Sequence, residues 1–143
     1  MTDTQIRLVQ QSFESVRPMA DIAADVFYTR LFELHPSLQR LFRTERREQG
    51  RKLMSMLAVA VNGLSRLDQI LPVIEELGRR HAQYGVRDEH YATVAEALLW
   101  TLQKGLGEAF TDEVRTAWEA AYTLLASMMQ RAAANKQPAI IAA

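Results

Sequence analysis

Apolar residues recur at the spacing of an α-helix along almost the whole of this 143-residue chain. In the first segment Ile6, Val9, Phe13 and Val16 lie three or four residues apart, which places them on one helical face. The alternation of apolar and polar residues that is typical of β-strands occurs almost nowhere. The pattern therefore predicts an all-α protein of about seven helices.

Prolines, glycines and capping residues mark the expected helix ends. We expect the second helix to run from about residue 19 to 34, a short helix from Pro36 to about Phe42, and no separate helix between Phe42 and Gln49. Asp88 and Thr111 are expected to be N-caps. The other predicted boundary residues are Pro18, Gly85, Gly105 and Gly107.

The composition excludes several classes of function. Lys plus Arg and Asp plus Glu both number 17, so no net positive charge favours binding to nucleic acid. No cysteine is present, which excludes disulfides, thiolate metal sites and thiol catalysis. The N-terminus lacks a signal-peptide pattern, and no apolar run approaches the roughly 20 residues of a membrane helix. We expect a cytoplasmic protein without a membrane span, with one domain over residues 1–134 and a disordered tail over residues 135–143.

His81 lies on the apolar face of an amphipathic segment. It follows Leu67, Leu71, Ile74 and Leu77 at helical spacing, so its ring points toward the interior. A buried imidazole either finds a hydrogen-bond partner or binds a metal. The pattern alone leaves both interpretations open, and a hydrogen-bonded core histidine is the simpler one.

The other two histidines, His35 and His90, are expected on the surface near helix starts. No His-x-x-x-His or Glu-x-x-His pair occurs, so a zinc or di-iron site with several histidines is not predicted. Haem needs only one protein ligand, because the porphyrin fills four positions around the iron. His81 could therefore serve a haem without help from a second histidine.

Three polar residues interrupt apolar faces elsewhere in the chain. Tyr28 and Tyr91 fall among apolar residues, so their rings are expected in the interior and the hydroxyl of Tyr28 needs a partner. Gln49 lies four residues before Leu53 and shares its helical face, which is uncommon for an amide. The simpler alternatives are packed core tyrosines and a Gln49 solvated in the first turn of its helix.

The first part of the chain, up to Leu53, resembles the distal side of the haem pocket in the globin family. The interval from Pro36 to Phe42 looks like the globin corner whose phenylalanine stacks on the haem. Tyr28, eight residues before Pro36, matches the distal-pocket position of the second helix. Gln49 and Leu53 look like the ligand-facing and apolar positions at the start of the distal helix.

The later part of the chain, from Leu77 onward, resembles the proximal side and the last helix of globins. The segment from Leu77 to Val86 looks like the proximal segment of a globin, with His81 as the iron ligand. Trp118 and Tyr122 look like residues of the last helix in bacterial globins. The specificity comes from the order and spacing of several elements, since each motif alone is common.

The resemblance covers about residues 3–132 and is closest to bacterial single-domain haemoglobins, similar to the globin domain of flavohaemoglobins. We expect no flavin or nicotinamide domain after the globin part, so the resemblance implies a separate reductase. Flavohaemoglobins place a glutamate about eleven residues after the tyrosine matched by Tyr122, and Ala133 stands there instead. In that family the glutamate and the tyrosine matched by Tyr91 polarise the iron-bound histidine, so we expect His81 to be a weakly donating ligand.

What the resemblance implies is a three-over-three helical sandwich around a non-covalent haem b. The other ring N–H of His81 would bond a backbone carbonyl near Leu77. Tyr28 and Gln49 would donate hydrogen bonds to bound O2, while CO would gain less. At about 1–1.5 kcal/mol each, two such bonds slow O2 release by roughly one to two orders of magnitude. The residues expected to contact the haem are Phe42, Leu53, Leu77, Val86, Tyr91 and Val94.

The implied function is reversible binding of O2 with high affinity, for storage, delivery or scavenging, with CO and NO as further ligands. The alternative is a nitric-oxide dioxygenase that depends on the separate reductase. A gas sensor is less favoured because no output domain is present, and a haem-free helical interaction module would lack a haem absorbance spectrum. We expect a monomer or a weak homodimer.

Overall fold

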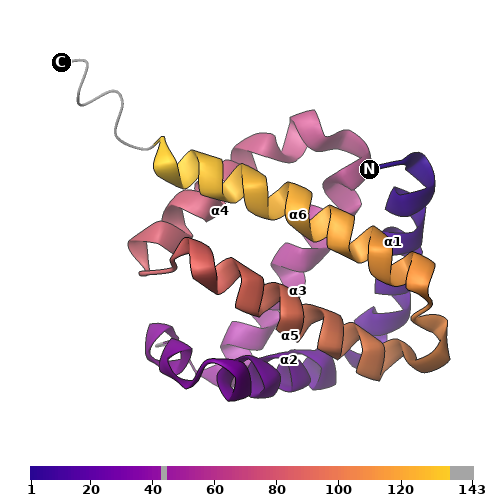
Figure 1. The fold of residues 1–143 in the computed structure, drawn as a ribbon, viewed down its shortest axis with the longest axis horizontal. Helices are drawn as coiled ribbons and strands as arrows, with labels where there is room; N and C mark the ends of the chain where they lie inside the picture. Colours follow the sequence, from indigo (N-terminus) through magenta and orange to yellow (C-terminus); the bar gives the residue numbers. More distant parts are fainter. Residues whose placement is uncertain (43–44, 136–143) are drawn as a thin grey trace.

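The computed structural model describes residues 1–42 and 45–135. In these ranges the chain is helical and contains no strand, which confirms the prediction of an all-α protein (Figure 1). The α-helices are α1 (Asp3–Val16), α2 (Ala20–Leu34), α3 (Arg46–Asn62), α4 (Leu67–Gln83), α5 (Asp88–Leu106) and α6 (Asp112–Ala134). The 3₁₀ helices are η1 (Arg17–Met19), η2 (Pro36–Leu41), η3 (Gly63–Arg66) and η4 (Gly107–Ala109).

Several boundaries differ from the expected ones. The described ranges contain six α-helices and four 3₁₀ helices instead of about seven helices. The segment after Pro36 is a 3₁₀ helix, closed by bonds such as that from Phe42 N–H to the Gln39 carbonyl at 3.2 Å. Asp88 is the first residue of α5 and not its cap, which is Arg87. The expected tail lies, from residue 136 onward, outside the described residues.

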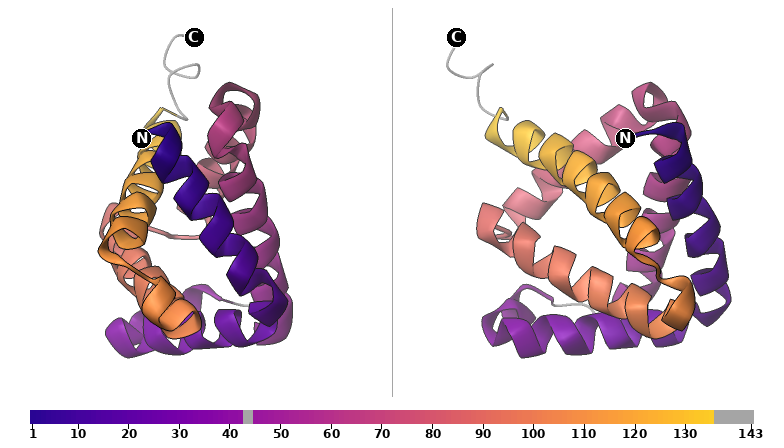
Figure 2. Two further views of the ribbon diagram at one scale, coloured as in Figure 1. Left: turned by 90° about the vertical axis from the view of Figure 1, so that its right-hand side faces the viewer. Right: turned by 45° about the vertical axis from the view of Figure 1, so that its right-hand side comes forward.

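The first and last helices pack against each other. The rings of Phe13 and Trp118 lie 6.4 Å apart between centroids, and Trp118 Nε1 donates to Ser12 Oγ at 2.8 Å. Gln10 Nε2 donates to the carbonyl of Val61 at 3.1 Å and so satisfies a carbonyl at the end of α3. Figure 2 shows α1 lying against both α6 and the far end of α3.

The helices form two layers around the centre of the molecule. α5 and α6 cross the front of Figure 1, with α3 behind them and α2 along the lower edge. The main packed pairs are α4 with α6, α2 with α5, α1 with α6 and α2 with α3. α3 makes few backbone contacts with α4, although the two are joined only by η3. Their separation leaves the facing sides of α3 and α4 to interact through side chains or a ligand.

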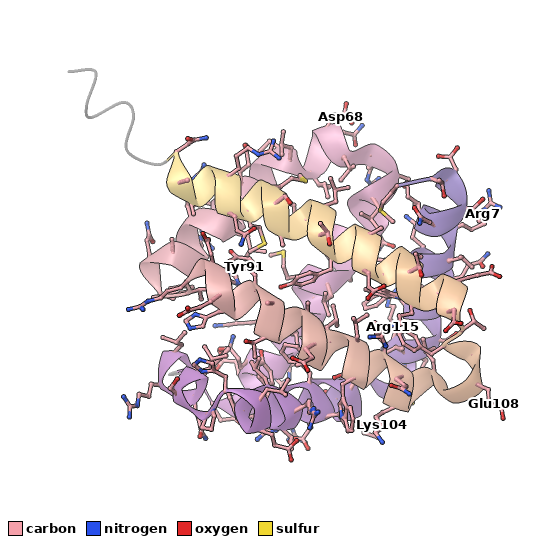
Figure 3. The ribbon with its side chains drawn as sticks, in the orientation of Figure 1. Arg7, Asp68, Tyr91, Lys104, Glu108 and Arg115 are labelled. Carbon is pink, nitrogen blue, oxygen red and sulfur yellow. The ribbon has the colours of Figure 1, made fainter. Side chains whose placement is uncertain are left out.

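A glycine allows the closest approach between α4 and α6. A Cβ added at Gly78 would lie 2.3 Å from the carbonyl oxygen of Met129. Ile70, Ile74 and Met129 form a buried apolar cluster around this crossing, and Ala60 joins it from α3. Charged side chains such as those labelled in Figure 3 lie on the outside of the helices. The crossing fixes the direction of α4, the helix that carries His81.

One helical stretch is long and apolar enough to cross a membrane by length and composition. It spans Arg46–Gln83. One 18-residue window in it has a mean hydropathy of 1.3, and 33% of that window is buried in the fold. This is weak support for a membrane span, because core helices of globular proteins have the same composition. The 3₁₀ turn Gly63–Arg66 also divides the stretch into α3 and α4.

Candidate functional site

Tyr28 occupies an aromatic cluster on the inner side of α2. Its ring lies 5.1 Å from Phe27, 6.0 Å from Phe32 and 5.3 Å from Phe42, measured between ring centroids. The side chain is only 3% exposed, as the apolar surroundings in the sequence predicted. Its hydroxyl donates to the backbone carbonyl of Gln49 at 3.4 Å. This distance is long for an O–H···O bond, so a better acceptor in the pocket could take the hydroxyl.

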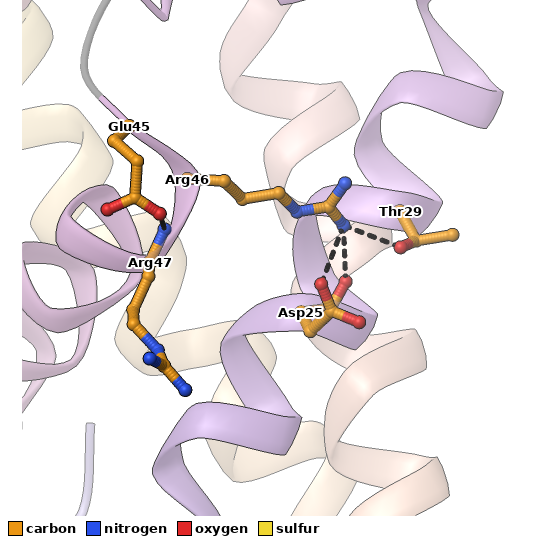
Figure 4. Close-up of polar contacts among 5 residues, drawn as sticks. All are labelled: Asp25, Thr29, Glu45, Arg46 and Arg47. Atoms are coloured by element: carbon orange, nitrogen blue, oxygen red, sulfur yellow. Dashed lines mark hydrogen bonds and ion pairs between the residues drawn. The ribbon is translucent and has the colours of Figure 1, made fainter.

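Close packing of α2 and α3 brings Gln49 to Tyr28. Gly50 is buried at the crossing, where an added Cβ would lie 2.9 Å from the Cβ of Ala24. Arg46 Nη2 reaches from the start of α3 to the backbone oxygen of Asp25 at 2.8 Å and to Thr29 Oγ1 at 2.6 Å (Figure 4). The carboxylate of Asp25 lies 3.2 Å from the same nitrogen.

The environment of Tyr28 keeps its hydroxyl protonated. Burial raises the pKa of Tyr28 to about 12, against smaller lowering effects from a hydrogen bond with Gln49 and from the charge of Arg46. At neutral pH the hydroxyl is therefore a hydrogen-bond donor. The half-buried Gln49 lies beside it, so the two predicted distal residues do come together.

His81 has the tautomer that a metal ligand requires. Its Nδ1 lies 2.8 Å from the carbonyl oxygen of Leu77, which can only accept, so Nδ1 carries the proton. The expected bond between this ring and a carbonyl near Leu77 is therefore present. Burial lowers the pKa of His81 more than this hydrogen bond raises it, so the ring is neutral and Nε2 has a free lone pair.

The predicted apolar contacts share an unusual degree of exposure. Each packs on a buried cluster or beside the His81 segment, yet each is only half-buried. Such side chains have one face on the core and another face available to a flat apolar group such as a porphyrin. Together with a neutral imidazole, this set fits haem. These residues are Phe42, Leu53, Leu77, Val86, Tyr91 and Val94.

The contacts divide the predicted residues into two groups. Tyr28, Gln49 and Phe42 lie together on the distal side, whereas His81 and Leu77 lie together on α4. Within the described ranges no hydrogen bond joins one group to the other. The roles of these residues toward haem therefore stay predictions, supported by their tautomer, burial and placement.

Leu57 is a lining residue that the sequence analysis missed. It is half-buried, and with Leu53 and Leu98 it borders an apolar cavity of about 20 Å³. Its position four residues after Leu53 is the signal that could have identified it.

Three features of the proximal side differ from the expectations or add to them. His90 is 9% exposed and buried, so its expected surface position is wrong. The hydroxyl of Tyr122 donates to the backbone carbonyl of Tyr91 at 2.6 Å and so ties α6 to α5. Ala133 is half-buried near the end of α6 and supplies no acceptor for the Tyr91 hydroxyl.

Known proteins show the same organisation. The globin family profile matches residues 25–129. The flavohemoprotein of Bordetella parapertussis is 38% identical over 106 residues, which is 72% of this chain and 26% of that protein. Neuroglobin of Danio rerio is 34% identical over 138 residues, and the match covers 87% of each chain.

Solved structures agree. An engineered carbene transferase, made from a Rhodothermus marinus protein proposed to be a nitric oxide dioxygenase, has a TM-score of 0.86 and 25% identity, with 100% and 99% of the two chains covered. The chain spans about a quarter of the length of the flavohemoproteins that it matches. The matched region extends from α2 to α6 and includes all the predicted site residues. This chain therefore belongs to the globin family, whose members bind haem.

Proposed function

We propose that this globin binds haem b through His81 and holds O2 with high affinity, for storage, delivery or scavenging. The observation that carries the proposal is the buried hydroxyl of Tyr28, which is protonated and weakly engaged at 3.4 Å from the Gln49 carbonyl. Haem, when bound, supplies the iron at which a diatomic gas binds. Tyr28 and Gln49 then discriminate among gases by donating hydrogen bonds.

The two donors act in a pocket where water competes poorly. Tyr28 lies among aromatic rings and loses only a long hydrogen bond when it turns toward a ligand. The side-chain amide of Gln49 can supply a second N–H. At about 1–1.5 kcal/mol for each bond, the pair would slow release of O2 by roughly one to two orders of magnitude. CO accepts hydrogen bonds less well and would gain less.

The test of the distal role is Tyr28→Phe, with release of O2 measured by stopped-flow. The expected result is an O2 release rate that rises several-fold while that of CO changes little. Tyr122→Phe is the matched control, since it also removes a hydrogen-bonded tyrosine hydroxyl, one that donates to the carbonyl of Tyr91. Equal O2 release rates in wild type and Tyr28→Phe would refute the donor role.

The test of the proximal role is His81→Ala, read by the absorbance of the purified protein. Loss of tightly bound haem is expected, because Nε2 of His81 is the proposed ligand. Haem retained in His81→Ala with the wild-type spectrum would refute the assignment.

Nitric-oxide dioxygenase is the second candidate function. The similarity to flavohemoproteins and to the Rhodothermus marinus protein favours it. It requires a reductase, and the described residues form only a globin fold. Consumption of NO under O2 with a supplied reductase, compared with the O2 release rate, separates the two. Turnover of NO much faster than O2 release would favour the enzyme.

A further inference from the structure

His90 caps the start of α5 in an unusual way. The backbone N–H of Arg87, the N-cap residue, donates to Nδ1 of His90 at 2.9 Å. In return, the backbone N–H of His90 donates to the carbonyl of Arg87 at 3.0 Å. The imidazole nitrogen therefore takes the place that a glutamine or glutamate oxygen occupies in a capping box. Thr2 and Gln5 show the ordinary form at the start of α1, where Thr2 N–H donates to Gln5 Oε1 at 3.0 Å.

This contact exists only when the His90 ring is neutral. An amide N–H can only donate, so Nδ1 must be without a proton and the neutral ring carries its proton on Nε2. Protonation of His90 would place a second N–H against that of Arg87, and the contact would break. The same requirement disfavours a metal ion between His35 and His90, because a metal-bound Nε2 would leave the proton to Nδ1.

Arg87 directly follows the turn that connects His81 to α5. The N–H of Val86 donates to the backbone carbonyl of His81 at 2.9 Å. Gly85 has a φ of 97°, which allows the chain to turn sharply before Val86. Arg87 then enters α5 with its N–H held by His90. Residues 84–87, which we call the proximal corner, are therefore fixed at one end by His81 and at the other by His90.

A second histidine, distant in the sequence, contacts the capping residue His90. The ring of His35 lies 5.4 Å from that of His90 between centroids, at an interplanar angle of 80°. His35 ends α2 and precedes η2, which leads to Phe42 on the distal side. Its Nδ1 lies 2.8 Å from Ser37 Oγ. The pair therefore connects the proximal corner with the segment that carries Phe42.

The surrounding charges add to the preference for a neutral ring. In the described part of the chain, the charged and titratable groups acting on His90 are His35, which follows α2, and Glu89 and Arg87 at the start of α5. Burial and His35 lower the pKa of His90, Glu89 raises it, and Arg87 lowers it again, with a net decrease.

We infer that neutral His90 is a positioning residue that holds the proximal corner behind His81, and that protonation of the His90 ring opens this corner in acid. The effect on bound haem rests on His81 being the iron ligand. The capping contact itself exists without haem and can be tested in the apoprotein. Opening would loosen Val86 and the last turn of α4, and so weaken the orientation of the His81 ring.

The key comparison is between His90→Gln and His90→Leu. Glutamine can accept from Arg87 N–H as Gln5 does from Thr2 and does not titrate, whereas leucine has no acceptor. In the wild-type apoprotein, exchange of the Arg87 amide hydrogen relative to Glu89 should accelerate about fivefold as pH falls below 6.5. His90→Gln should keep the slow rate throughout, and His90→Leu should show the fast rate at neutral pH.

The haem-loaded protein supplies the second readout. The iron–histidine stretching band should shift or broaden in acid in wild type, stay constant in His90→Gln, and be altered at all pH values in His90→Leu. His35→Gln removes the electrostatic effect by which His35 lowers the pKa of His90, so both transitions should move to higher pH.

The outcomes separate this inference from the proposed function. A pH-dependent Arg87 exchange that persists in His90→Gln would overturn the inference. A transition whose midpoint pH is the same in His35→Gln as in wild type would also overturn it. If His81 were not the iron ligand, the iron–histidine band would be missing from every variant, while the exchange experiment on the apoprotein would still decide the role of His90.

Discussion

Replacing Gly78 with alanine should force α4 away from α6. Gly78 is buried where the two helices cross, and an added Cβ would lie 2.3 Å from the carbonyl oxygen of Met129, with the Cα at 2.6 Å. Ordinary contacts of a Cβ begin near 3.4 Å, so the helices must separate by about 1 Å. The atoms in the way belong to the backbone, so no side-chain rotation relieves the clash.

The size of the effect follows from two opposing contributions. Forcing extra volume into a packed interior costs about 1–3 kcal/mol. Alanine is a better helix former than glycine by about 1 kcal/mol, which offsets part of that cost. Separation also exposes the cluster of Ile70, Ile74 and Met129, so the steric contribution should dominate. We expect Gly78→Ala to lower the free energy of unfolding by about 1–3 kcal/mol.

Gly105→Ala is the matched control. Gly105 is an exposed glycine inside α5, and its added Cβ would meet nothing closer than Met19 Cε at 3.7 Å. It should gain about 0.5–1 kcal/mol from helix propensity alone. Urea unfolding of both apoprotein variants, followed by circular dichroism, measures the difference. A Gly78→Ala protein as stable as Gly105→Ala would refute the argument that the helices touch at Gly78.

Three further predictions concern stability. Ser12→Ala should cost about 1–3 kcal/mol in urea unfolding, because Trp118 Nε1 would lose its acceptor in a buried site. Thr111→Ala should cost about 1 kcal/mol by the same measurement, since it removes the N-cap of α6. The pKa of His81 and of His90 is lowered below 6.5 in the fold, so the unfolded chain binds protons first. Apoprotein stability should be full above pH 6.5 and fall as the pH drops through the folded-state pKa values; an equal stability at pH 5 and pH 7.5 would contradict this.

Local patterns were sufficient to predict many features of the site. Helical spacing placed His81 on an inward face, and the structure adds the bond to the Leu77 carbonyl that the helix geometry allows. Apolar neighbours predicted the burial of Tyr28, and Thr111 does cap α6. Each of these properties depends on residues within one or two helical turns, so sequence spacing carries the information.

The position of His90 could not be predicted in this way. Its neighbours Asp88 and Glu89 are typical of an exposed first helical turn. The ring is buried because the end of α2, with His35, packs against the start of α5, a contact between residues more than fifty positions apart. The cap of α5 is Arg87 and not Asp88, and the backbone N–H of Arg87 donates to the ring nitrogen of His90.

The pairing of α1 with α6 determines when the packing of α1 can form during synthesis. Ser12 and Phe13 leave the ribosome early, but their partner Trp118 is made 105 or more residues later. Until then Phe13 lacks its aromatic neighbour, and α1 lacks α6, the helix against which it packs most extensively. Contacts so distant along the chain form slowly. The nascent protein therefore exposes an apolar face of α1 from the synthesis of Phe13 until that of Trp118, and this face is open to a chaperone in that interval.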